Sequence, residues 1–199
     1  MKKTVLFVLL EQYADWEAAY LSSAIHMLGQ ENYSVKTVSL TKECVHSLGG
    51  FSVLPDYDIH SIPEQYCALI LIGGMSWRSD AARQVEPLVQ DALERQRIIG
   101  GICDASGFLG TVGALNDVRH TSNDLKDLKQ WAGERYTGEA NYVMEQAVRD
   151  RNVITANGTA ALEFAREVLL ALEAAPENKI LEWYDFHKLG CYEAPMPQM

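Results

Sequence analysis

The stretch "RIIGGICDASGFLGTVGAL", residues 97–115, decides the fold of this chain. Its first part, 97–103, is a short apolar run of the kind that forms a parallel strand covered on both faces. Its second part, 104–115, is rich in small residues and has helical character. The pattern predicts a buried strand that passes abruptly into a helix, with Cys103 at the turn between them.

The segments on either side alternate between strand and helix in the same way. Apolar or alternating runs predict strands, and amphipathic runs predict helices. The expected strands are 4–10, 33–40, 67–74 and two within 142–156 joined by a turn at 149–152, and the other expected helices are 15–28, 80–96 and 158–174. A Gly49-Gly50 turn indicates a hairpin or an edge excursion. The whole predicts an α/β fold, with a doubly wound, mostly parallel sheet flanked by helices in a three-layer sandwich, and ligands bind such sheets at the carboxyl ends of the strands.

The length and composition predict one compact domain. Of the 199 residues, 48% are apolar, which is enough to bury a full core. We expect that domain to span 1–175, because Pro176 ends the last strong helix. The remainder, 176–199, is then a C-terminal extension packed on the same domain through Leu181, Trp183, Tyr184 and Phe186. This aromatic tail is a candidate dimer contact or lid.

The charge balance argues against nucleic acid and membranes as partners. The chain has 27 acidic and 17 basic side chains and a formal net charge of -10, so it lacks the basic footprint that phosphate backbones or anionic lipids require. The start, "MKKTVLFVLLEQY", could pass for a short signal peptide, but Glu11 closes the apolar run early and no small-residue cleavage site follows. We therefore expect a cytoplasmic protein.

Cysteine usage agrees with that compartment. Cys44, Cys67, Cys103 and Cys191 are widely scattered, with no C-x-x-C pair, so reduced thiols are expected. No residue cluster has metal-ligand spacing, and no segment resembles a phosphate-binding loop. We expect neither a metal nor a cofactor.

The turn at Cys103 is the strongest chemical signal in the chain. Small neighbours on both sides allow the tight strand-to-helix turn of a nucleophile elbow, which points its side chain out of the sheet. The amino end of the following helix would favour a thiolate and any oxyanion nearby. An ordinary small buried cysteine is the alternative that these residues leave open.

Several motifs then occur in the order of a known family. They are "TVLFVLLEQYADWE" with its Tyr13-x-Asp15-x-Glu17 pattern, "ALILIGG", "GGICDASGFLG", "RHTSN" at 119–123 and the closing helix "TAALEFAREVLLAL". The chain resembles the class I glutamine amidotransferase-like superfamily, in the branch of the PfpI intracellular proteases and the Parkinson-disease-associated protein deglycase. The resemblance runs from the first strand to the end of the helix at 158–174, and it implies a flavodoxin-like fold.

The resemblance implies a role for each matching residue. Cys103 would be the reactive residue, and Glu17 would lie beside its sulfur as a protonated hydrogen-bond donor to the thiolate. The backbone N–H groups of Gly74 and Asp104 would form an oxyanion hole. On residue type alone, Glu17 would be a first-turn helix carboxylate and Gly74 part of a strand-end turn.

The sequence departs from the family pattern beside the cysteine. The next residue is Asp104 instead of a histidine, and its carboxylate is a poor base whose charge opposes thiolate formation. Its other role is that of a helix-start residue. Asn123 stands where the family has histidine or tyrosine; it can orient a substrate but cannot carry protons at neutral pH. His120 either reaches the crevice or is a satisfied structural histidine. The late His187 lacks a glutamate two positions on, so glutamine hydrolysis is not expected.

Three functions follow from these residues. The first is a cysteine-dependent hydrolase, hydratase or glyoxalase/deglycase-like enzyme acting on small electrophiles, with Cys103, Glu17 and Asp104 as catalytic residues and Gly74, Asp104, Asn123 and His120 at the oxyanion or substrate. The second is a redox-responsive, non-catalytic stress protein that senses oxidation at Cys103. The third is a binding module with a pocket at Trp77, Arg78 and Trp131. The resemblance also implies a homodimer.

Overall fold

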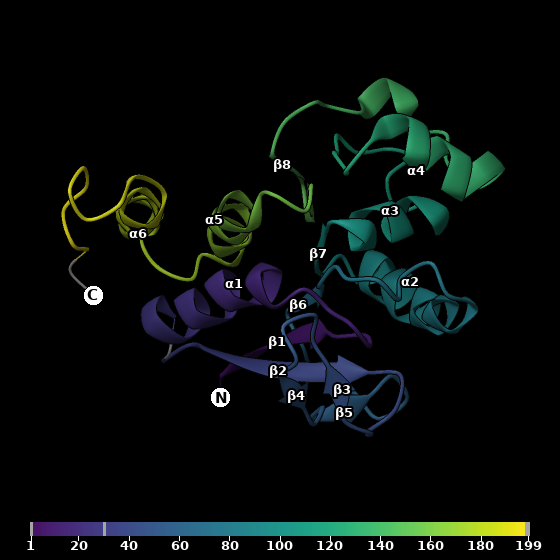
Figure 1. Cartoon of the computed structure of the whole chain (residues 1–199), viewed down its shortest axis with the longest axis horizontal. Helices are drawn as coiled ribbons and strands as arrows, with labels where there is room; N and C mark the ends of the chain where they lie inside the picture. Colours follow the sequence, from purple (N-terminus) through teal and green to yellow (C-terminus); the bar gives the residue numbers. More distant parts are fainter. Residues whose placement is uncertain (1, 30, 198–199) are drawn as a thin grey trace.

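The computed structural model describes residues 2–29 and 31–197. Within them, seven strands form one sheet in the order β5-β2-β1-β6-β7-β9-β8, and helices lie on both of its faces (Figure 1). The strands of this sheet are β1 (Lys3–Val8), β2 (Tyr33–Ser39), β5 (Tyr57–Asp58), β6 (Ala68–Leu71), β7 (Ile98–Ile102), β8 (Ala147–Asp150) and β9 (Val153–Ala156). All neighbouring pairs are parallel except β8 with β9. A separate antiparallel hairpin consists of β3 (Val45–His46) and β4 (Ser52–Val53).

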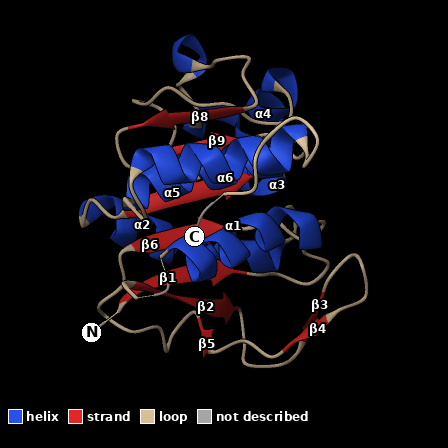
Figure 2. Ribbon diagram, turned by 90° about the vertical axis from the view of Figure 1, so that its left-hand side faces the viewer, coloured by secondary structure: helices blue, strands red, loops and turns tan. Residues whose placement is uncertain are grey.

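The helices divide into two layers around this sheet. They are α1 (Asp15–Leu28), α2 (Glu86–Glu94), α3 (Asp104–Thr111), α4 (Leu125–Ala132), α5 (Ala161–Leu172) and α6 (Glu177–Leu189), with the 3-10 helices η1 (Asp80–Val85), η2 (Gly133–Arg135) and η3 (Glu139–Asn141). Figure 2 shows α1, α5 and α6 in front of the sheet. The side chains of α2, α3 and α4 pack on the opposite face.

The alternation within β1 explains the two layers. Val5 and Phe7 pack with the α1 and α5 side chains, whereas Leu6 and Val8 pack with those of α2 and α3. Because successive side chains of a strand point to opposite faces, a continuous apolar run buries both faces. The predicted three-layer α/β sandwich with a mostly parallel sheet is confirmed.

The strand order places the crevice. β1 lies between β2 and β6, so the chain reverses direction across the sheet at β1, and ligands of doubly wound folds bind beside such a reversal. The carboxyl ends of β1, β6 and β7 lead directly to the segments that carry Glu17, Gly74 and Cys103. Residues far apart in the sequence are thereby brought to one edge of the sheet.

Several element boundaries differ from the sequence-based expectation. The helix predicted over 80–96 is divided into η1 and α2, with Pro87 in the first turn of α2, where its missing N–H costs no hydrogen bond. Helix α3 ends at Thr111 because Gly113, at φ +77°, takes a left-handed conformation. The strand β8 begins only at Ala147, and α4 was not predicted.

The C-terminal helix α6 packs directly on α5. Ile180 and Trp183 are buried in the same cluster as the α5 side chains. At the edge of this contact, Glu163 of α5 accepts hydrogen bonds from Tyr184 Oη at 3.0 Å and from Lys188 Nζ at 2.7 Å. Segment 177–189 is thus part of the same packed unit.

Among the described residues, no helix has the length and apolar character required to cross a membrane.

Candidate active site

Cys103 stands at a sharp turn between β7 and α3. Its backbone has φ 60° and ψ -133°, a conformation that non-glycine residues rarely adopt and that costs on the order of 1–3 kcal/mol. Its N–H donates to the Ala156 carbonyl at 3.0 Å, and its carbonyl accepts from the Ser106 N–H at 3.0 Å. The first bond ties the strained turn to the neighbouring strand β9, and the second ties it to the first turn of α3. This is the arrangement that the elbow motif predicts.

Two glycines let three segments converge on this turn. A methyl group on Gly73, after β6, would lie 2.3 Å from Glu17 Oε2 and 2.5 Å from Cys103 Cβ. One on Gly158, after β9, would lie 2.9 Å from Cys103 Sγ and 3.4 Å from Glu17 Oε1. Both distances from Gly73 are shorter than carbon atoms tolerate. The sulfur and the carboxyl group of Glu17 therefore share one pocket whose walls include two residues without side chains.

Glu17 is an acid buried without a partner. It lies in the first turn of α1 and is 1% exposed, and neither carboxyl oxygen has a hydrogen-bond partner among the described residues. Burial raises its pKa to about 7, although nearby polar groups of Cys103 and Gly73 partly offset this effect. A large fraction of Glu17 is therefore protonated at neutral pH.

The pKa of the Cys103 thiol is raised, whereas the pKa of an activated thiol is lowered. Burial raises its pKa to about 11, and the negative charge of Glu17 contributes to the rise. Asn123 and the Asp104 backbone N–H act against this by hydrogen bonding to the sulfur. Because each charge opposes the other, the two groups titrate as a pair, and the pair retains one proton over a wide pH range.

One side-chain donor in this pocket reaches the sulfur. Asn123 Nδ2 donates to Cys103 Sγ at 3.4 Å. The orientation of the Asn123 amide is set by the Gly158 N–H, which donates to Asn123 Oδ1 at 2.8 Å. Asn123, in the loop between α3 and α4, thus connects the cysteine turn with the glycine after β9.

The Asp104 carboxylate is bound to an arginine that sequence reasoning placed only in a possible pocket. Arg78 Nε lies 2.9 Å from Asp104 Oδ2, and Arg78 Nη2 lies 3.3 Å from Oδ1. The same guanidinium pairs with Asp127 of α4 at 2.6 Å and lies 4.6 Å from the centre of the Trp131 ring. Asp127 carried no signal in the sequence, because this pairing depends on how α4 packs.

His120 has no ring nitrogen available for a substrate. The residue is fully buried, its Nδ1 lies 2.8 Å from the Val118 carbonyl and its Nε2 lies 2.7 Å from Tyr136 Oη. Burial lowers its pKa, so the ring is neutral at pH 7. This is the geometry of a satisfied structural histidine, and it differs from the substrate contact that the sequence left open.

Gly74 occupies a position that requires glycine. At φ +148°, a methyl group there would lie 2.4 Å from the Gln12 carbonyl oxygen and 2.6 Å from Tyr13 Cα. Gly74 forms a bridge with Tyr13, and Tyr13 in turn bridges to Ser47 in the hairpin region. The glycine turn after β6 is therefore packed tightly against the segment that leads into α1.

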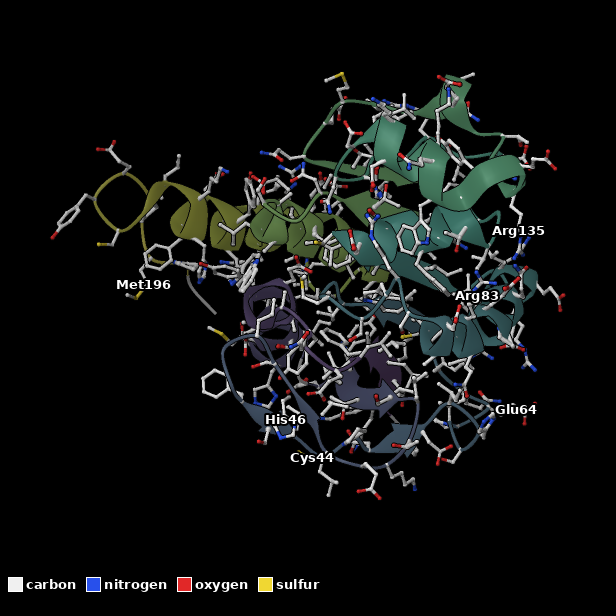
Figure 3. All side chains as sticks on the ribbon, turned by 45° about the vertical axis from the view of Figure 1, so that its right-hand side comes forward. Cys44, His46, Glu64, Arg83, Arg135 and Met196 are labelled. Carbon is white, nitrogen blue, oxygen red and sulfur yellow. The ribbon has the colours of Figure 1, made fainter. Side chains whose placement is uncertain are left out.

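A small cavity adjoins the arginine side of this region. Its volume is about 160 Å³, and its lining includes Trp77, Arg78 and Trp131, the three residues that the sequence suggested for a pocket. Arg83 and Arg135 also line it, and Figure 3 shows them together on the side of the molecule away from Cys44 and His46. The residues described contain no group of three side chains that could hold a metal ion.

Comparisons with known proteins agree with this fold. The chain is 42% identical over 193 residues to the uncharacterized protease YdeA of Bacillus subtilis, covering 96% of this chain and 93% of that protein. It is 33% identical to a DJ-1 superfamily protein of Agrobacterium tumefaciens, with a TM-score of 0.85 over 94% of this chain and 98% of that one. A thiJ/pfpI family protein of Bacillus anthracis is 30% identical, with a TM-score of 0.87 over 94% and 91% of the two chains.

The family model described as DJ-1/PfpI matches residues 3–171, from β1 almost to the end of α5. With the elbow at Cys103, the glycine turn after β6 and the doubly wound sheet in place, this match and these relatives show that the chain belongs to the DJ-1/PfpI family.

Proposed function

We propose that this chain is an enzyme in which the Cys103 sulfur attacks the electrophilic carbon of a small molecule. The observation that carries the proposal is the pairing of a strained elbow cysteine with Glu17, a buried acid whose pKa is raised to about 7. A group that titrates near neutral pH is the best placed to give and take protons there. Glu17 thus supplies the proton carrier that Asp104 and His120 do not.

The chemistry of the first step follows from the groups around the sulfur. With Cys103 as the thiolate and Glu17 protonated, the sulfur forms a bond to a carbonyl carbon and the π electron pair of the C=O bond moves to its oxygen. Protonated Glu17 gives its proton to that oxygen, and the backbone N–H groups of Gly74 and Asp104 stabilise the oxyanion. In a 2-oxoaldehyde the hydrogen of the attacked carbon then moves to the neighbouring carbonyl carbon as in a glyoxalase-like reaction, and water hydrolyses the resulting thioester to a 2-hydroxy acid and the free thiol. In an isocyanide the proton goes to the attacked carbon itself, and water converts the thioimidate to a formamide and the free thiol.

The pocket favours small substrates over peptides. Gly73 and Gly158 contact the catalytic pair from two sides, and Glu17 is 1% exposed, so little space is left beside the sulfur. A Cys-His pair of the protease type would need a free imidazole nitrogen, and both nitrogens of His120 are used by Val118 and Tyr136. Peptide cleavage is therefore less well supported than turnover of small electrophiles.

The test is the rate of Cys103 alkylation by iodoacetamide as a function of pH, resolved by mass spectrometry. If the single negative charge of the pair lies on the sulfur, the wild-type rate rises through an inflection near neutral pH, well below the ordinary thiol pKa of ~8.5. Glu17→Gln should shift this inflection, because the thiol no longer shares a proton with an acid. Turnover of phenylglyoxal and of an alkyl isocyanide should be lost in Cys103→Ala. A wild-type thiol that reacts only in strong alkali, together with turnover that survives Cys103→Ala, would contradict the proposal.

A redox-responsive role is the second candidate, favoured by the donors at the sulfur. Asn123 Nδ2, the Asp104 N–H and protonated Glu17 could all donate to the oxygens of an oxidised cysteine. Graded peroxide treatment followed by mass analysis tests it, with the exposed Cys44 and Cys191 as internal references. This role requires that Cys103 be oxidised before those two residues.

We also propose a cytoplasmic location and a homodimer. The location is supported by Cys44, Cys67, Cys103 and Cys191, which are all free thiols, as a reducing compartment requires. The homodimer is an expectation from the family to which the chain belongs. Light scattering after size-exclusion chromatography measures the mass in solution. A mass close to 22.2 kDa would contradict the dimer.

A further inference from the structure

Arg78 lies between two carboxylates beside the reactive turn. It comes from the segment between β6 and η1, and its guanidinium bonds to both oxygens of Asp104 and to both oxygens of Asp127. Its planar face stacks on Trp131, which also packs against Gly107, where an added methyl group would lie 2.7 Å from the ring. The arginine is thus held in one place by α3 and α4 together.

The carboxylate that Arg78 binds is close to the sulfur. Asn123 Nδ2 lies 3.4 Å from Cys103 Sγ and 3.4 Å from Asp104 Oδ1, so these two atoms are at most ~7 Å apart, a distance at which charges interact. Asn123 therefore donates to the sulfur and to Asp104 together. A change in the position or charge of Asp104 reaches the sulfur both directly and through this amide.

We propose that Arg78 is a positioning residue for the reactive cysteine: it neutralises the Asp104 carboxylate and holds it so that Asn123 can keep its hydrogen bond to the sulfur. The inference rests on the proposed function, because it concerns how readily the Cys103 sulfur carries a negative charge. It assigns a purpose to the unusual Asp104 beside the cysteine, since the arginine supplies the compensating charge.

The charged and titratable groups that face the sulfur define the expected effect. They are Glu17 from α1 and Asp104 from α3, with Arg78 and Asp127 beyond Asp104. Burial is the main cause of the high pKa of Cys103, and the charge of Asp104 raises that pKa further even with the arginine in place. Removing the arginine charge should therefore raise it again.

The test uses the pH profile of Cys103 alkylation in three variants. Arg78→Gln should move the inflection up by about one pH unit and slow alkylation at pH 7 about fivefold, as expected for one unpaired charge at this distance. Arg78→Gln combined with Asp104→Asn should return the profile close to the wild type, because both charges are gone. Asp104→Asn alone should move the inflection down.

The outcomes separate this inference from the proposed function. A wild-type profile in Arg78→Gln, with a shifted profile in Glu17→Gln, overturns the inference and leaves the proposed function standing. A double variant as slow as Arg78→Gln also overturns it, because loss of structure would then be the cause. If Arg78→Gln does not fold, the Asp104→Asn variant tests the inference. An inflection in Asp104→Asn that rises or stays at the wild-type pH overturns it. A wild-type cysteine that shows no neutral inflection overturns both proposals.

Discussion

Replacing Glu17 by glutamine should stabilise the protein at alkaline pH and leave it almost unchanged in acid. The acid is 1% exposed and its carboxyl oxygens have no hydrogen-bond partner among the described residues. Its pKa rises from the ordinary 4.5 to about 7, chiefly because burial disfavours the charged form. At 1.36 kcal/mol per pH unit, that difference corresponds to about 3 kcal/mol.

The direction of the pH dependence follows from proton binding. Between these two pKa values the folded protein holds a proton that the unfolded chain has released, so the free energy of unfolding falls as the pH rises. Below 4.5 both states are protonated and the contribution disappears. Glutamine has nearly the same shape and does not ionise. The stabilisation by Glu17→Gln should therefore be about 2.5 kcal/mol larger at pH 8 than at pH 5.

Urea unfolding at pH 5 and pH 8 measures this difference. Glu134→Gln, which changes an exposed glutamate, is the matched control and should show almost no pH-dependent change. The same comparison in a Cys103→Ala background should retain most of the effect, because burial is the largest cause of the raised pKa. A gain that differs by less than ~0.5 kcal/mol between the two pH values would refute the assignment of Glu17 as a buried, partnerless acid.

Three further substitutions test the rest of the site. Gly73→Ala should lower stability by about 2–3 kcal/mol and abolish alkylation of Cys103, since its methyl group meets atoms at 2.3 and 2.5 Å. Gly133→Ala, at φ +58° but in open space, should cost only about 1 kcal/mol in urea unfolding. His120→Leu should cost about 3 kcal/mol in the same assay, because it leaves buried partners unpaired, while the inflection of the alkylation profile stays in place. Asn123→Ala should slow alkylation at pH 7 several-fold by removing a donor to the sulfur, and an unchanged rate would contradict the role given to that amide.

The elements that decide the fold could be predicted because local pattern and global packing agree in them. The runs at 4–10 and 97–103 are apolar on both faces, which is sufficient to place them inside a parallel sheet. Helix α4 was missed because its eight residues follow a loop with no repeat long enough to indicate a helix. The boundary within 80–96 was missed because a proline such as Pro87 can either interrupt one long helix or stand in the first turn of a second helix.

The site also contains residues that the sequence could place and contacts that it could not. Cys103, Glu17 and Gly74 follow the ends of predicted strands, so topology alone brings them to one edge. The partners of Asp104 and His120 lie in segments whose placement depends on tertiary packing, namely the loop that carries Arg78, helix α4 and the region of Tyr136. Sequence spacing carries no information about those contacts, which is why the charge on Asp104 looked uncompensated.

The arrangement around Cys103 is difficult to explain as a device for stability. The turn adopts a backbone conformation that costs on the order of 1–3 kcal/mol, and the acid beside it costs about 3 kcal/mol when it ionises. Glycine at 103 would relieve the first cost, and glutamine at 17 would relieve the second without leaving a cavity. Sheet pairing and core packing do not require either residue. Both unfavourable features lie in one pocket and are held there by Gly73, Gly158 and Asn123. Strain and a perturbed acid are useful where a bond is made or broken, so this concentration is typical of a reactive site.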